Sequence, residues 1–150
     1  MTSNFASLDK SKPCEESSSK DAYDNFVWKH ILRQIFPRDS KHEWQRYLKS
    51  ENLCGRAPVQ SFIDASENEV KNICSRSGLY LYNNLCMSQK RMTIYEVHST
   101  NNSVCTVESV KKITQFVIVA CNKVRNQCRP VHFQEYSHQK PTKHPCISHV

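Results

Sequence analysis

Two histidines lie in segments whose patterns place them next to apolar residues. His30 follows Phe26 by four positions in the run FVWKH, so the two share one face of a helix. His132 interrupts the strand-like run RPVHF between Val131 and Phe133. Imidazole titrates near neutral pH, so one ring can accept a proton while another donates one. Such a pair across a groove suits in-line phosphoryl transfer, provided that a positive charge stabilises the transition state.

Taken singly, each of these histidines also fits an ordinary role on the surface or in the core, because imidazole suits many environments. We interpret the remaining histidines as solvated, since they lie in polar contexts at positions 42, 98, 138, 144 and 149. The catalytic hypothesis therefore depends on elements that bring His30 and His132 together.

Helical patterns fill the first half of the chain. Apolar residues recur at helical spacing over Asp21–Phe36, and this helix should end before Pro37. Ser40–Lys49 predicts a second helix, and a capping box from Ser66 to Glu69 opens a third. Short β-prone runs follow and predict strands at Val59–Ile63, Met92–Val97, Cys105–Val110, Thr114–Cys121 and Arg129–Phe133. This order is typical of an α+β fold with an antiparallel sheet.

The length of 150 residues suits one compact domain. Residues 1–20 are rich in Ser and Lys without periodicity, so we expect a flexible extension there. Residues 21–135 form the predicted domain, and 136–150 a tail that a disulfide could tether. Only two glycines occur, so asparagines are expected to supply several turns with positive φ, and Asn83-Asn84 and Asn101-Asn102 mark turns.

The chain is basic, with 21 Lys and Arg against 14 Asp and Glu and a formal net charge of +7. Such a field attracts polyanions such as nucleic acid, heparin-like glycans or an anionic bacterial membrane. The alternative is a basic surface that serves solubility alone. The sequence has no apolar run near the ~20 residues that span a bilayer.

Eight cysteines, an even number and mostly far apart, favour disulfides formed in an oxidising compartment. Zinc sites usually need close ligand pairs such as CxxC, and the tightest spacing here is Cys121-x6-Cys128, which argues against a metal. Asn101-Asn-Ser103 is a glycosylation sequon consistent with secretion. The polar start lacks the apolar segment of a signal peptide, so we expect a secreted protein whose leader peptide is not in this sequence.

The strongest functional signal is the order of several short motifs. They are FVWKH at 26–30, CGRAPVQSFI at 54–63, ENEVKNIC ending at 74, MTIYEV at 92–97, QFVIVAC at 115–121 and PVHF at 130–133. In this order and spacing, over residues 21–135, the chain resembles the pancreatic ribonuclease (ribonuclease A) superfamily. The resemblance implies an α+β fold in which three helices pack on a V-shaped antiparallel sheet with a catalytic groove.

The resemblance also implies a reaction and its residues. His30 matches the family's general base and His132 its general acid, so the 2′-OH of single-stranded RNA would attack the adjacent phosphorus 3′ to a pyrimidine. A 2′,3′-cyclic phosphate would form, without metal or cofactor. Ser61 matches the hydroxyl residue that reads the pyrimidine, because serine both donates and accepts. Phe133 matches the aromatic wall of the base pocket.

Three positions depart from the family pattern. Ala57 stands where the family has its catalytic lysine, and Arg56 is the nearest cation. Lys29 replaces the usual glutamine before the helix histidine and could add charge at the substrate phosphate, and Gln134 replaces the carboxylate that follows PVHF. Because loss of one transition-state stabiliser commonly costs about 10²- to 10³-fold in rate, we expect an RNA endonuclease of reduced activity.

The family's disulfides are only partly represented. Cys54–Cys105 and Cys74–Cys121 match two family bridges, whereas Trp44 and Val97 stand at the two positions of a third. The other four cysteines allow three pairings. A Cys128–Cys146 bridge would resemble the tail bridges of frog members, and Cys14 would then pair with Cys86.

A second function fits the same fold. Because the lysine is missing, the protein could be a non-catalytic effector that is antimicrobial, angiogenin-like or specific for a receptor, an anionic glycan or a bacterial membrane. The basic residues available for this role are Lys90, Arg91, Lys111, Lys112, Lys123, Arg125, Arg129, Lys140 and Lys143. In either role we expect a monomer.

Overall fold

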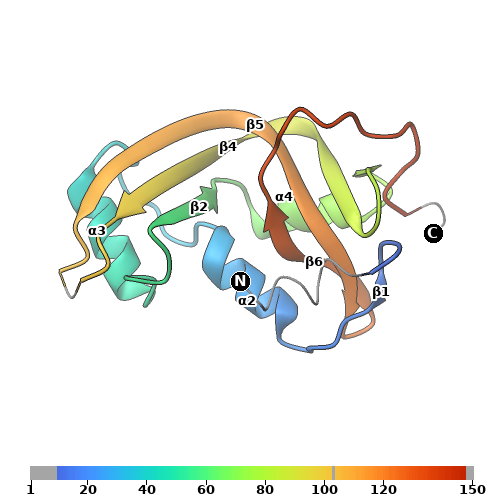
Figure 1. Ribbon diagram of the computed structural model, residues 1–150, viewed down its shortest axis with the longest axis horizontal. Helices are drawn as coiled ribbons and strands as arrows, with labels where there is room; N and C mark the ends of the chain where they lie inside the picture. The colour runs from blue at the N-terminus through green and yellow to red at the C-terminus, as the bar shows by residue number, and fades with distance from the viewer. Residues whose placement is uncertain (1–9, 103, 148–150) are drawn as a thin grey trace.

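A computed structural model describes residues 10–102 and 104–147 of the chain (Figure 1). The elements are, in chain order, β1 (Glu15–Glu16), α2 (Ala22–His30), α3 (Lys41–Ser50), β2 (Val59–Ile63), α4 (Glu67–Lys71), the short 3₁₀ helix η1 (Asn72–Cys74), β3 (Leu79–Tyr80), β4 (Leu85–Ser99), β5 (Val107–Val124) and β6 (Gln127–Gln134). Three α-helices on one sheet confirm the predicted α+β class. No helix in the described part of the chain is long and apolar enough to cross a membrane.

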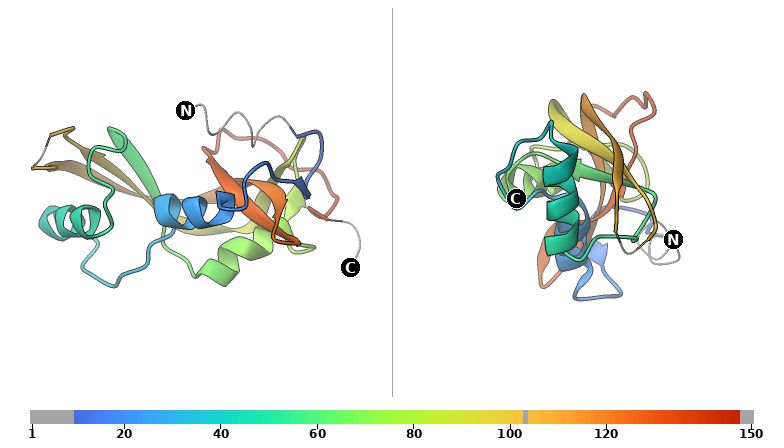
Figure 2. Two further views of the ribbon diagram at one scale, coloured as in Figure 1. Left: turned by 90° about the horizontal axis from the view of Figure 1, so that it is seen from below. Right: turned by 90° about the vertical axis from the view of Figure 1, so that its left-hand side faces the viewer.

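A long hairpin of β4 and β5 organises the sheet. The strand order is β1-β5-β4-β2, with β3 also on β4 and β6 also on β5. All pairs are antiparallel except β1 with β5, so the sheet is mixed. A register shift between Met87 and Arg91 interrupts the hairpin, and such irregularities bend strands. Figures 1 and 2 show the hairpin arching over α2, with α3 at one end and β6 at the other.

Two predicted strands merge in β5. Cys105–Val110 and Thr114–Cys121 were separated in the sequence pattern by polar Lys111 and Lys112, but the strand runs unbroken from Val107 to Val124. Both lysines stay paired with β4, opposite Glu96 and Tyr95. Backbone pairing therefore continues where the apolar alternation lapses, because both lysine side chains are exposed to solvent.

Helix α2 ends well before the predicted boundary at Phe36. Ile31 adopts extended geometry, with φ −108° and ψ 124°, and forms a bridge to Ile63 of β2. Leu32 continues this pairing, donating its N–H to the carbonyl of Ile63 at 3.2 Å. Burial of Ile31 beside β2 outweighs the helical propensity of the following residues, and His30 thereby becomes the last helical residue.

The two positions of the missing family bridge lie in one apolar cluster. Trp44 and Val97 are each 0% exposed and belong to the core between α3 and the sheet. The indole ring of Trp44 lies 5.3 Å from the ring of Tyr95 and 5.5 Å from that of Phe62. Its Nε1 donates to the Arg38 carbonyl at 2.7 Å, so the polar atom is satisfied. Apolar packing therefore joins α3 to the sheet at these two positions.

Asparagines supply several left-handed turn positions, as the scarcity of glycine predicts. Asn52, Asn83 and Asn126 have φ of 57°, 51° and 65°. Asn126 follows Arg125, also at positive φ, in the tight connection between β5 and β6. The turn at Arg125 and Asn126 fixes the register of β6, the strand that carries His132.

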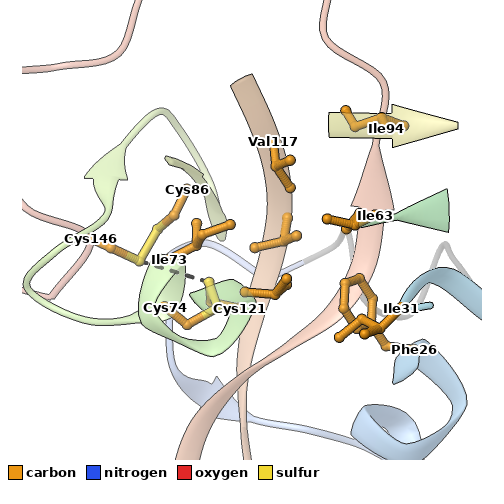
Figure 3. Close-up of a cluster of buried hydrophobic side chains, with 12 residues drawn as sticks. Phe26, Ile31, Ile63, Ile73, Cys74, Cys86, Ile94, Val117, Cys121 and Cys146 are labelled. Carbon is orange, nitrogen blue, oxygen red and sulfur yellow. Dashed lines mark hydrogen bonds between the residues drawn. A yellow bond between two sulfur atoms is a disulfide. The ribbon is translucent and has the colours of Figure 1, made fainter. Parts of the chain in front are cut away.

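Four disulfides pair all eight cysteines. Cys54–Cys105 and Cys74–Cys121 are the pairs that the family resemblance implies. The predicted Cys128–Cys146 and Cys14–Cys86 bridges are wrong, because Cys14 pairs with Cys128 and Cys86 with Cys146. Figure 3 shows Cys86–Cys146 beside Cys74–Cys121, and the Sγ atoms of Cys121 and Cys146 are 3.8 Å apart.

Cys14 reaches Cys128 because residues before α2 add a strand to the sheet. Glu15 and Glu16 pair with Asn122 and Lys123 of β5, and Lys123 lies opposite Cys128 of β6. Cys14 itself donates its N–H to the Cys121 carbonyl at 2.9 Å. Residues 14–17 of the predicted extension are therefore paired with β5, and its first nine residues lie outside the described part.

Cys146 reaches Cys86 because the C-terminal tail follows β3. Tyr80 donates its N–H to the His144 carbonyl at 2.9 Å, and Cys146 donates its own to the Gly78 carbonyl at 2.8 Å. Tyr80 lies opposite Cys86 in the β3–β4 pair, so the tail arrives next to that cysteine. Gly78 also lies close against the backbone of η1, since a Cβ there would lie 1.8 Å from the Ile73 carbonyl oxygen.

Candidate active site

His30 occupies the C-terminal end of α2, between the helix and β2. Its Nδ1 lies 2.9 Å from the carbonyl oxygen of Ser61. Its ring packs between two aromatic rings, with centroids 5.5 Å from Phe26 and 5.2 Å from Phe133. The predicted face shared by Phe26 and His30 is therefore present, and Phe133 of β6 completes the contact between the two elements, which lie side by side in Figures 1 and 2.

The environment of His30 favours its neutral form. Burial lowers the pKa of His30 to about 3. The hydrogen bond to Ser61 opposes this shift, whereas the charges of Arg56, His132 and Lys29 lower the pKa further. These three residues lie on different parts of the chain, and the charge of each acts on the same ring.

His132 lies on β6 opposite Ala120 of β5, directly beside a register shift in that pair. The side chain is half-buried and hydrogen-bonds with the side chain of Gln134. Burial lowers the pKa of His132, the bond to Gln134 raises it, and the charge of Lys29 lowers it. An amide at position 134 therefore contacts the ring from the place where the family has a carboxylate.

Arg56 is held by a residue that the sequence did not single out. Its Nε donates to Oε1 of Gln60 at 3.0 Å, and Nε2 of Gln60 donates to the Leu53 carbonyl at 2.8 Å. Gln60 is only 1% exposed, so this orientation is fixed. Burial lowers the pKa of Arg56 below its usual value, yet a guanidinium stays charged at neutral pH. The arginine thus presents a partly desolvated cation near His30.

Lys29 adds a second cation to the same place. It is half-buried, and burial together with the charge of Arg56 lowers its pKa. Lys29 directly precedes His30 at the end of α2, and its charge lowers the pKa of both histidines.

The remaining predicted residues are placed as follows. Ser61 lies in β2, partly exposed, opposite Glu96 of β4. Asn101 is exposed, and its Oδ1 would lie 2.8 Å from a Cβ on Gly55, where φ is +73°. Ser103 of the glycosylation sequon lies outside the described residues. The close sulfur atoms of Cys86, Cys121 and Cys146 belong to two disulfides.

The roles of two supporting residues, Gln60 and Gln134, are not predictable from the sequence. Gln60 lies four positions after Arg56 in the run GRAPVQ, and a buried strand position offers no reason to expect a side-chain contact back to the loop. The sequence marks Gln134 only as the residue that replaces the family's carboxylate. In both cases the signal was a polar residue in an otherwise apolar strand, which usually has a hydrogen-bonding partner.

Comparisons with known proteins identify the family and the fold of the chain. The model of the pancreatic ribonuclease family matches residues 21–134. The crystal structure of green turtle egg white ribonuclease matches with a TM-score of 0.61 at 19% identity, over 77% of this chain and 98% of that chain, which bears on the fold. No curated protein sequence matches. Family and fold support a ribonuclease-type function with RNA as substrate, and the four disulfides fit the secreted proteins of this family. The chain belongs to the pancreatic ribonuclease family.

Proposed function

We propose that the protein is a secreted endonuclease that cleaves single-stranded RNA 3′ to pyrimidines and leaves a 2′,3′-cyclic phosphate. The observation that supports this most directly is the position of His30. Its Nδ1 faces the Ser61 carbonyl, and its pKa responds to the charges of both His132 and Arg56. This reaction needs a neutral base, a second imidazole as the acid and a cation beside the phosphate, and the charges that act on His30 support this assignment.

In the proposed mechanism, Nε2 of His30 removes the proton from the 2′-OH, whose oxygen attacks phosphorus. His132 in its protonated form gives a proton to the departing 5′ oxygen, so the P–O5′ bond breaks as the P–O2′ bond forms. Arg56 and Lys29 stabilise the negative charge on the non-bridging oxygens. The Ser61 side chain is proposed to pair with the pyrimidine, and Phe133 to flank it.

The same groups support a reduced rate near neutral pH. His132 must carry a proton to act as the acid, and burial lowers its pKa. Only a minor fraction of the enzyme is then in the active protonation state at pH 7. Arg56 is also fixed by Gln60 rather than free to follow the phosphate.

The test is cleavage of the dinucleotide uridylyl-adenosine, followed by ³¹P NMR for the cyclic phosphate. Wild-type protein should form it, and His30→Ala and His132→Ala should each lower kcat/KM by about 10²- to 10⁴-fold. His42→Ala, which removes an exposed histidine of α3, should leave the rate unchanged. The proposal fails if wild-type protein forms no cyclic phosphate between pH 3 and 8, or if the rate survives loss of both histidines.

A negative result with folded protein would favour the non-catalytic alternative. In that case antimicrobial or receptor-binding activity should persist in a His30→Ala/His132→Ala double variant.

A further inference from the structure

Helix α2 contacts strand β6 near both of its ends. At the C-terminal end of the helix, the ring of His30 lies 5.2 Å from that of Phe133. Near the N-terminal end, the guanidinium carbon of Arg129 lies 5.1 Å from the centre of the Tyr23 ring. Figures 1 and 2 show the two elements side by side. The helix that carries one candidate catalytic histidine is thus attached twice to the strand that carries the other.

The two contacts are separated by similar lengths on both elements. Tyr23 and His30 are seven residues apart in α2, so they share one side of the helix and lie about 10 Å apart along its axis. Arg129 and Phe133 lie opposite residues of β5 that are three positions apart, because β6 has one extra residue at Val131. This span is also about 10 Å at the usual rise of a strand. The contact at Tyr23 therefore fixes how far α2 can slide along β6.

Tyr23 itself is held firmly. Its side chain is only 4% exposed, and its hydroxyl group donates a hydrogen bond to Oε2 of Glu67, the first residue of α4. Burial and this bond raise the pKa of Tyr23, so the hydroxyl keeps its proton and remains a donor. The Nζ atom of Lys71, also on α4, lies 5.9 Å from the centre of the ring. The ring is therefore a fixed surface on which Arg129 rests.

Arg129 depends on this ring for a partner at its buried end. Among the described residues, its buried Nε has no hydrogen-bond partner. Cation–π attraction is strongest where the cation is removed from water. A second arginine, Arg125, pairs with Asp21 and Asp24 at 3.7 and 3.2 Å, but these side chains are exposed and such pairs contribute little. The contact of Arg129 with Tyr23 is therefore the stronger attachment at this end of α2.

We propose that Tyr23 and Arg129 are a positioning pair that sets the separation of His30 and His132. This inference rests on the proposed RNA cleavage, in which base and acid must reach opposite sides of one phosphorus. With the contact at Phe133 alone, α2 could pivot about its C-terminal end. A misplacement of about 1 Å between reacting groups can cost about 10²-fold in rate.

The experiment measures kcat and KM for uridylyl-adenosine. Arg129→Met removes the guanidinium and keeps an apolar chain, and it should lower kcat by about 10- to 100-fold. KM should change by less than about twofold, because positioning acts on bound substrate. Arg129→Lys keeps a cation for the ring and should recover at least about threefold of the lost rate. Tyr23→Leu/Arg129→Met should be no slower than Arg129→Met, since both residues act through one contact.

The matched control is Arg91→Met. It also removes an exposed or half-buried arginine that lies over an aromatic ring, because the guanidinium carbon of Arg91 is 4.6 Å from the centre of the Phe116 ring. Both constants should stay within about twofold of wild type, since Arg91 does not contact α2 or β6 through that ring. Equal losses of kcat in Arg91→Met and Arg129→Met would overturn the proposal. A raised KM with unchanged kcat in Arg129→Met would also overturn it, because Arg129 would then bind RNA directly.

Nuclear Overhauser effects between the rings of His30 and Phe133 give a readout that needs no activity. They should be present in wild type and Arg91→Met and weaker in Arg129→Met. If they are unchanged in Arg129→Met, the positioning role is refuted, whatever the rate. If wild-type protein does not cleave the dinucleotide, the proposed function fails, and these effects still decide whether the pair positions α2. Tyr23→Phe, which removes only the hydroxyl bond to Glu67, replaces Arg129→Met in both measurements if the latter does not fold.

Discussion

Nδ1 of His30 lies 2.9 Å from the backbone carbonyl oxygen of Ser61. A carbonyl oxygen only accepts hydrogen bonds, so Nδ1 must carry the proton and donate it. In the neutral ring Nε2 is then unprotonated and available as a base. The strand that holds the candidate base reader, Ser61, thereby also fixes the tautomer of the candidate base.

The first prediction concerns the pH dependence of cleavage. The base must be neutral and the acid protonated, so kcat/KM should rise through the pKa of His30, near 3, and fall through that of His132, which is lowered from 6.5. The optimum should therefore be acidic, below pH 6.5. Rates measured on uridylyl-adenosine from pH 3 to 8 check this, and a plateau extending above pH 7 would contradict it.

The second prediction isolates the charge of Lys29. Its positive charge lowers the pKa of both histidines, so Lys29→Gln should raise both values and move the whole profile to higher pH. KM should also rise at moderate salt, because one cation near the phosphate is lost. Lys49→Gln, at an exposed position on α3, makes the same change in net charge and should leave the profile in place. A shift of equal size in both variants would mean that net charge alone is responsible.

The third prediction concerns Arg56 and its anchor. Arg56→Ala should lower kcat/KM by about 10²- to 10³-fold, the usual effect of losing one transition-state donor. Gln60→Ala keeps the cation but frees it, so a smaller loss of about tenfold is expected. The variant should also lose roughly 0.5–1.5 kcal/mol of stability, because one buried hydrogen bond to the Leu53 carbonyl disappears while the bond from the Arg56 N–H remains. Single-turnover rates well below the melting temperature separate the two effects.

Arg33→Ala is the control for Arg56→Ala, since Arg33 is an exposed arginine paired with Glu51 at 2.9 Å. It should change the rate less than twofold by the screening of exposed charges. If Arg56→Ala is as mild as this control, then Lys29 alone supplies the stabilising charge.

Local signals predicted much of the fold. The run VQSFI matches β2 end to end, and Ser66 and Glu69 form the predicted capping box at α4. Ser40 caps α3 by accepting from the N–H of Glu43 at 3.2 Å. Each of these features depends on residues within a few positions of one another, which is why the sequence pattern specifies them.

Features that depend on distant partners were not predictable in the same way. The end of α2 depends on the bridge to Ile63, and the position of β1 depends on its pairing with Asn122 and Lys123. The position of the C-terminal tail depends on its hydrogen bond with Tyr80. Similarly, the resemblance identified His30 and His132 as a pair, but the contacts of Gln60 and Gln134 required coordinates. A short polar segment such as Cys14-Glu15-Glu16 contains no pattern that indicates which strand it will pair with.

The fourth prediction tests the corrected disulfides. Peptide mapping of unreduced protein should link Cys14 to Cys128 and Cys86 to Cys146. The Cys86→Ser/Cys146→Ser double variant opens a loop of 60 residues, so chain entropy predicts a loss of about 4 kcal/mol in the free energy of unfolding. Its kcat/KM should change little, because β5 still holds β6. A Cys128–Cys146 peptide would contradict the pairing.

The fifth prediction is that Trp44 carries the stability that a covalent bridge supplies in the family. Trp44→Ala should lower the free energy of unfolding by about 3–5 kcal/mol, because it leaves a large cavity and frees the Arg38 carbonyl that accepts from the indole. Tyr82→Ala, which removes an aromatic side chain that is 51% exposed, should cost far less. Urea unfolding followed by far-ultraviolet circular dichroism measures both. Equal costs for the two variants would mean that the core of Trp44, Phe62 and Tyr95 collapses around the loss, and that packing at this position does not replace the bridge.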